Sequence, residues 1–104
     1  MTFVEINSGI CGFKTRVSVR KSDHRTVSIL IDTDCPNIKK VAGKITSVKP
    51  LRELFCRLHE TETYIALLSG IAHPACLVPA GVLKGIEVEA GLALPKDGYI
   101  RVTP

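Results

Sequence analysis

The chain has 104 residues, of which 45% are hydrophobic; it contains four cysteines and carries a formal net charge of +4. This length and apolar fraction suit one domain, residues 1–104, whose core forms without disulfide bonds. No basic, apolar leader begins the chain, and no apolar run approaches the roughly 20 residues that span a bilayer, so we expect neither a signal peptide nor a membrane protein. We place the chain in the cytoplasm, where thiols stay reduced and four cysteines indicate metal binding or catalysis.

The first third of the chain has the alternation that is typical of half-buried β-strands. Residues 3–6 form a short strand candidate, and a turn signal follows at Asn7-Ser8-Gly9. Two longer stretches then alternate with period two, and their inward positions are Phe13, Thr15, Val17 and Val19 on the first and Val27, Ile29 and Ile31 on the second. We predict that these two strands form an antiparallel hairpin around the polar turn at residues 21–24.

The middle of the chain favours short helices that begin at prolines. One is expected to begin at Pro36, with a stripe formed by Ile38, Val41, Ala42 and Ile45. The next is expected to begin at Pro50, with an inner stripe formed by Leu51, Leu54, Phe55 and Leu58. A third is expected over residues 62–71, with Tyr64, Ile65, Leu68 and Ile71 facing inward.

The last part of the chain predicts one longer helix and a final strand. The helix begins at Pro79 and ends near Gly91, with Val82, Leu83 and Ile86 facing inward. Residues 99–102 are expected to return as an edge strand. The order of strands, then helices, then one strand predicts an α+β fold in which three to four helices pack on one face of a small antiparallel sheet.

The hairpin alternation predicts that two cysteines meet. Pairing Val19 with Val27 keeps both apolar sets on one face, whereas a one-residue slip would expose one of them. Continued toward the open end, this register places Cys11 directly opposite Cys35, with Cβ atoms about 4.5–5.5 Å apart, where two thiols can share a metal ion. A slip of two residues keeps the same faces inward and leaves the two cysteines near neighbours.

Two further residues are expected at the same site. Cys35 and Cys76 each precede a predicted helix, where free N–H groups and the helix dipole favour a thiolate. His73 lies three residues before Cys76, so both side chains fall on one side of a turn, which is a spacing typical of metal ligands. The sequence therefore predicts a site formed by Cys11, Cys35, Cys76 and His73.

Other polar residues are not assigned to this site as ligands. Cys56 points away from the stripe of its predicted helix, so we expect it to be partly exposed and not a ligand. His24 and His59 are expected to be solvated. Asp32 and Asp34 lie near the site and are candidates to orient a ligand or to cap a helix.

A basic surface is predicted on the outer side of the hairpin. It is formed by Lys14, Arg16, Arg20, Lys21 and Arg25. A solvated sheet face explains it most simply, and docking of an acidic partner protein is the alternative. Few aromatic residues and no recognised nucleic-acid motif are present, so we expect no nucleic-acid partner.

The cysteine motifs carry a resemblance to known families. Ile10-Cys11-Gly12-Phe13, Asp34-Cys35-Pro36-Asn37 and His73-Pro74-Ala75-Cys76 resemble an uncharacterised family of small cysteine-containing domains from anaerobic archaea and bacteria. The layout is also similar to the NifU-type iron–sulfur cluster scaffold. That resemblance implies that Cys11, Cys35 and Cys76 stand for the three scaffold cysteines and that His73 stands for the histidine of that family.

Three functions remain open from the sequence. The leading hypothesis is a scaffold or carrier that binds zinc or an iron–sulfur cluster through Cys11, Cys35 and Cys76. The fourth ligand is His73, or that position stays open to water, a ligand from a partner or a second metal. The second is a thiol-redox protein with Cys35 as nucleophile and Cys11 as resolving thiol. The third is a non-catalytic module whose basic hairpin surface docks a partner protein.

Overall fold

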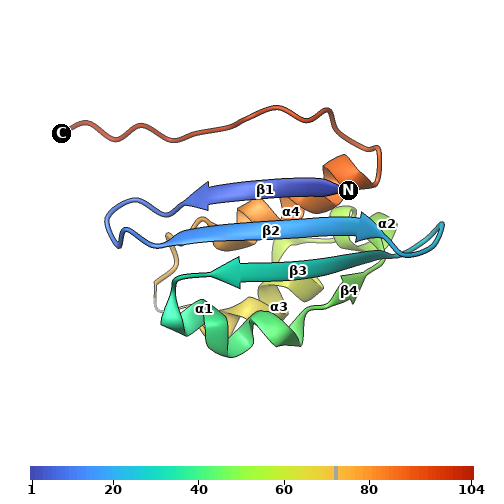
Figure 1. Ribbon diagram of the computed structural model, residues 1–104, viewed down its shortest axis with the longest axis horizontal. Coiled ribbons are helices and arrows are strands. Elements are labelled where there is room, and N and C mark those ends of the chain that lie inside the picture. Colours follow the sequence, from blue (N-terminus) through green and yellow to red (C-terminus); the bar gives the residue numbers. More distant parts are fainter. Residues whose placement is uncertain (72) are drawn as a thin grey trace.

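Among the residues that the computed structural model describes, four antiparallel strands form one sheet and four α-helices cover one of its faces (Figure 1). The structure describes residues 1–71 and 73–104. The strands, in the sheet order β1-β2-β3-β4, are β1 (Thr2–Asn7), β2 (Lys14–Lys21), β3 (Val27–Thr33) and β4 (Ser47–Val48). The helices are α1 (Pro36–Val41), α2 (Pro50–Leu54), α3 (Glu62–Leu68) and α4 (Val78–Glu89), with 3₁₀ turns η1 (Ala42–Lys44) and η2 (Leu58–Glu60). The predicted α+β fold is confirmed, whereas the two-residue strand β4 was not predicted.

The alternation of the hairpin is confirmed, but its predicted register is wrong by two residues. Val19 pairs with Ile29, whereas the prediction paired it with Val27. The turn and the far end of the ladder explain this offset. Asp23 Oδ1 accepts a hydrogen bond from the Arg25 N–H at 2.7 Å in the turn, and the buried hydroxyls of Thr15 and Thr33 are 2.7 Å apart at the other end. Because the slip is even, the same side chains still face the core.

Helix α4 lies close against β1 and β2 because two glycines face the sheet. A Cβ atom at Gly85 would lie 2.9 Å from methyl groups of Val19 and Val4, and one at Gly81 would overlap the side chain of Ile6. The helix buries Val82 and Ile86 completely between these contacts. The small residues therefore set the distance between the helix layer and the sheet, and they were not recognised from the sequence.

The predicted inner stripe of the second helix is wrong. Helix α2 ends at Leu54, so the later positions of the stripe do not belong to the same helix. Leu51 is 68% exposed and Phe55 is 75% exposed, while Pro50 and Glu53 face the core. The periodic apolar pattern spans nine residues, whereas the helix is only five residues long.

The predicted stripe of the third helix is also rotated. Thr63 and Leu67 are the buried residues of α3, whereas Ile65 is 60% exposed and Leu68 is 57% exposed. The reason is the buried carboxylate of Glu53, which accepts hydrogen bonds from the Thr63 N–H and hydroxyl groups. Burial of the Glu53 carboxylate with Thr63 therefore faces Thr63 toward the core, and the more apolar side of α3 faces solvent.

The final edge strand that the sequence predicted does not form. Residues 94–104, termed the C-terminal segment here, adopt neither helix nor strand. They follow β1 along its outer side and run in the same direction as that strand (Figure 1). A strand added in that direction would make the parallel pairing, which is slightly less stable per residue than the antiparallel one.

Glu89 at the end of α4 bonds the helix to the sheet, and its titration is expected to make the stability of the protein depend on pH. Its carboxylate accepts hydrogen bonds from the Thr2 hydroxyl at 2.8 Å and the Lys21 N–H at 3.0 Å, and these bonds lower the pKa of Glu89. A carboxylate with a lowered pKa stabilises the fold above its unfolded pKa of about 4.3, and this contribution is lost as the pH falls through the folded pKa. Glu89→Gln is therefore expected to destabilise the protein at neutral pH and to converge with the wild type in acid.

Urea unfolding of both proteins at about pH 7 and about pH 3 measures this difference. Glu87→Gln on the same helix is the matched control, because its carboxylate makes neither of these two bonds. An equal gap between wild type and Glu89→Gln at the two pH values would contradict the assignment.

Among the helices in residues 1–71 and 73–104, none combines the length and the apolar character that a bilayer crossing needs.

Candidate functional site

Three segments that are distant in sequence meet at one end of the sheet. They are the turn between β1 and β2, the junction between β3 and α1, and the segment from residue 73 that leads into α4. All three lie at the left end of the molecule in Figure 1. Each carries at least one of the residues that the sequence assigned to a site.

A pocket of about 110 Å³ lies between these segments and is termed the thiol pocket here. Its walls contain three thiols and one imidazole among apolar and small polar side chains: Cys11, Cys35, His73 and Cys76, with Ser8, Phe13, Asn37, Ile38, Ile71 and Val78. The four residues selected from the sequence thus line one pocket, and Cys56 does not line it. The half-buried residues Cys35 and Cys76 pack against the core, whereas Cys11 and His73 are exposed at the rim.

The first thiol is held in a tight turn. Gly9 and Gly12 have φ angles of +88° and +73°, which a side chain would disfavour. The Gly12 N–H donates to the Gly9 carbonyl at 2.9 Å, so the chain reverses around Ile10 and Cys11. The predicted pairing of Cys11 directly opposite Cys35 is wrong, because β2 begins only at Lys14 and the ladder register is shifted by two residues.

The second thiol is fixed by the end of the sheet. The Cys35 N–H donates to the Thr33 hydroxyl at 3.1 Å, and that hydroxyl is itself bonded to the buried Thr15 hydroxyl. Pro36 follows in the first turn of α1, and the Cys35 carbonyl accepts the Lys39 N–H at 2.9 Å. Cys35 is therefore held from both sides, by β3 and by α1.

The thiols and the imidazole share the pocket without forming a closed ligand set. In the parts of the chain that the structure describes, no three His, Cys, Asp or Glu side chains are grouped closely enough to hold a metal ion. All four cysteines are free thiols. The pocket therefore has two half-buried candidate ligands, Cys35 and Cys76, and two exposed ones, Cys11 and His73.

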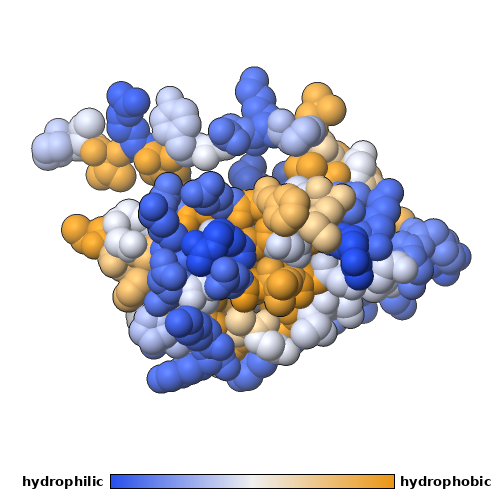
Figure 2. Space-filling model, in the orientation of Figure 1, coloured by the Kyte–Doolittle hydropathy of each residue, from blue (hydrophilic) through white to orange (hydrophobic). Residues whose placement is uncertain are grey.

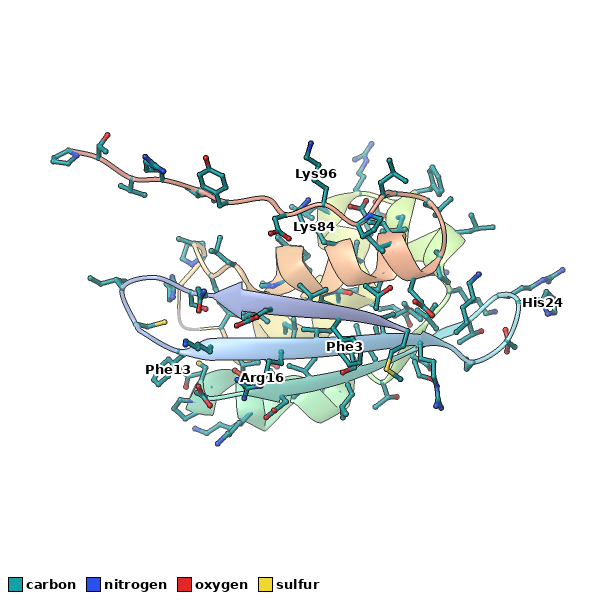
Figure 3. All side chains as sticks on the ribbon, turned by 45° about the horizontal axis from the view of Figure 1, so that its top comes forward. Phe3, Phe13, Arg16, His24, Lys84 and Lys96 are labelled. Carbon is teal, nitrogen blue, oxygen red and sulfur yellow. The ribbon has the colours of Figure 1, made fainter. Side chains whose placement is uncertain are left out.

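The polar residues considered beside the site lie elsewhere. Asp32 and Asp34 are exposed and face Arg16, with N–O distances of 3.0 and 3.8 Å, so they neither cap α1 nor reach the pocket. Cys56 is exposed, as expected, and its Sγ lies 3.6 Å from the Glu53 carbonyl. His24 is at the tip of the β2–β3 hairpin, far from the labelled Phe13 at the pocket end (Figure 3).

Six of the ten pocket residues were not assigned to the site from the sequence, and among them Ser8, Phe13 and Asn37 lie within three residues of Cys11 or Cys35. Phe13 was predicted only as an inward position of its strand, and Ser8 only as part of a turn. Asn37 lies in the first turn of α1, two residues after Cys35. The signal that could have found them is their position directly beside the two cysteine-bearing turns.

Comparison with known proteins places the chain in a family. No curated protein and no solved structure matches it. A family model described as a family of unknown function (DUF6951) matches residues 2–102. Because this match covers nearly the whole sequence, the chain belongs to that family.

Proposed function

We propose that this protein binds a metal centre in the thiol pocket. Cys11, Cys35 and Cys76 are the thiolate ligands in this proposal, and His73 is the fourth ligand. The observation that carries it is the convergence of these four residues, from three separate segments, on one pocket of about 110 Å³. Three thiolates and an imidazole suit zinc, and thiolates also hold iron–sulfur clusters.

An iron–sulfur cluster suits the pocket better than a single ion. Zinc requires every ligand at about 2.0–2.3 Å from one point, and the described residues do not offer three ligands in such a group. A cluster contains several atoms, so its ligands surround a larger volume. The hollow between the thiols supports that choice, and zinc remains the alternative metal.

The exposure of two ligands favours a scaffold or carrier. Cys35 and Cys76 are half-buried, whereas Cys11 and His73 lie at the surface. Buried ligands anchor a centre, and exposed ligands in turns can open toward an acceptor protein. A structural metal site is instead closed by four fixed ligands, whereas two of the four proposed here lie at the surface.

The test is to purify the chain without oxygen, supply iron and sulfide, and record metal content and absorption. We expect a stoichiometric centre with sulfur-to-iron absorption bands in the wild type. Cys35→Ser is expected to lose it, because this ligand is fixed by β3 and α1 and has no substitute. Cys56→Ser is the matched control and is expected to keep the full content.

The outcomes separate the candidate functions. If the purified protein holds stoichiometric zinc and no iron, the metal in the site is a zinc ion and not an iron–sulfur cluster. Equal losses in Cys35→Ser and Cys56→Ser would contradict the ligand assignment. A wild type that binds no metal would contradict the proposal itself.

A thiol-redox role is the second candidate, because Cys11 and Cys35 are both free and line the same pocket. In that role Cys35 attacks a disulfide substrate, its thiolate displaces one sulfur of the substrate as a thiol, and Cys11 then resolves the mixed disulfide. The metal-free protein would then form a reversible Cys11–Cys35 disulfide, which peptide mapping after mild oxidation detects.

A further inference from the structure

The outer edge of β1 is open. In the sheet order β1-β2-β3-β4, β1 pairs with β2 along all six residues and has no strand on its other side among the described residues. Half of its backbone N–H and C=O groups therefore point away from the sheet. Such an edge is a template for another strand unless it is covered or interrupted.

The C-terminal segment has the composition of a strand and has no partner strand among the described residues. Tyr99, Ile100 and Val102 are 83%, 72% and 86% exposed. The stretch Tyr-Ile-Arg-Val-Thr is rich in aromatic and β-branched residues, which are enriched in strands. The chain thus carries both an open edge and an extended segment with exposed apolar side chains.

A groove separates these two features. Its volume is about 1060 Å³, with β1 from Thr2 to Asn7 on one wall and Gly98 to Ile100 on the other, and Lys84 and Val88 of α4 also line it. Figure 2 shows the C-terminal segment standing apart from the body of the molecule, and Figure 3 shows Lys84 beneath it. The groove follows β1 along its whole length.

We propose that this groove binds the C-terminal segment of a second copy of the chain, so that two copies exchange these segments reciprocally. The direction of the segment supports this occupant. It runs the same way as β1 of its own chain (Figure 1), so a two-fold related copy of it enters the groove antiparallel to both neighbours. The resulting order across the axis is β1, partner segment, own segment, partner β1, with every pair antiparallel.

One register matches both side-chain faces. Val4 and Ile6 turn toward the helices, while Phe3 and Glu5 point to the open face. Placing Val102 of the partner opposite Val4 puts Ile100 opposite Ile6 on the helix side. The same register places Arg101 opposite Glu5 on the open face, which pairs opposite charges.

The first experiment measures molecular mass by analytical ultracentrifugation under reducing conditions, at chain concentrations up to about 1 mM. We expect a concentration-dependent dimer for the wild type. Deletion of residues 98–104 is expected to give a monomer, and Val102→Pro the same, because proline removes a ladder donor. Arg101→Lys keeps the charge and is expected to keep the dimer.

The second experiment exchanges charges between copies. Glu5→Arg and Arg101→Glu are each expected to weaken the dimer about tenfold, because each places like charges opposite one another at both symmetric contacts. A mixture of the two variants restores opposite charges at both contacts of the mixed dimer and is expected to recover the wild-type dissociation constant. Circular dichroism checks that each variant remains folded.

Three outcomes would overturn the proposal. If the wild type is monomeric at every concentration, the groove does not bind a second copy, and its occupant is another protein or the segment of the same chain. A dimer that survives deletion of residues 98–104 forms through another surface. Recovery only when both charge changes are in one chain, and not on mixing, assigns the pairing to a single molecule.

Discussion

Replacing Glu53 by alanine is expected to lower the free energy of unfolding by about 3 kcal/mol. The Glu53 side chain on α2 is 3% exposed and bonds the beginning of α3. Its carboxylate accepts the N–H groups of Glu62 and Thr63, each at 2.8 Å, and the Thr63 hydroxyl. These are the first free donors of α3, and a negative charge beside them is also favoured by the helix dipole.

The size of this effect follows from the buried donor groups that lose their acceptor. Alanine removes three charge-assisted hydrogen bonds and leaves buried donors without an acceptor, which costs more than the bonds themselves contribute. Chemical unfolding at neutral pH measures the loss. Glu60→Ala, an exposed glutamate beside the same helix, is the matched control and is expected to change stability by less than about 0.5 kcal/mol. A Glu53→Ala loss as small as the control would show that the carboxylate does not hold α3.

Gly70→Ala is expected to destabilise the protein by about 2 kcal/mol, because α1 approaches the end of α3 at this residue. A Cβ atom here would lie 2.5 Å from the backbone oxygen of Asn37 and 2.6 Å from a methyl group of Val41. The carbonyl cannot rotate away as a side chain would, so α1 itself must shift. That shift would also move Asn37 in the wall of the thiol pocket.

Gly43→Ala provides the matched control for this substitution. A Cβ atom at Gly43 meets nothing within 4 Å, and its backbone is not in the left-handed region. This variant is expected to be neutral or more stable by up to about 1 kcal/mol, since alanine restricts the unfolded chain. Thermal unfolding of both variants measures the contrast, and equal effects would show that the contact between α1 and α3 does not require glycine.

Strands β1, β2 and β3 could be predicted from the sequence because their signal is local. Side chains alternate between the two faces of a strand, so the buried set that includes Thr15, Val17, Val19 and Ile29 follows from parity alone. The positions of α1 and α4 follow similarly from Pro36, Pro79 and Gly91, which restrict the backbone directly. Parity does not distinguish registers that differ by two residues. The observed register is selected by the turn after β2 and by the Thr15–Thr33 hydrogen bond.

The faces of α2 and α3 could not be predicted from hydrophobicity. Their buried residues include Glu53 and Thr63, which are satisfied only by each other and by the beginning of α3. A pattern of apolar residues cannot reveal a polar pair that becomes favourable only after the chain brings its partners together. Leu51 and Ile65 are exposed as a consequence.

The thiol residues show the same division between local and tertiary information. The sequence by itself determined which residue types stand at turns and helix starts. It set Cys56 apart from Cys11, Cys35 and Cys76 by a predicted helix position, although α2 ends at Leu54, before Cys56. The tertiary structure decided that Cys11 reaches the pocket through a glycine turn and not through the strand ladder, and it brought Cys35, His73 and Cys76 to the same pocket. Backbone preferences act over a few residues and can be recognised in sequence, whereas the meeting of three distant segments depends on how the sheet and helices pack.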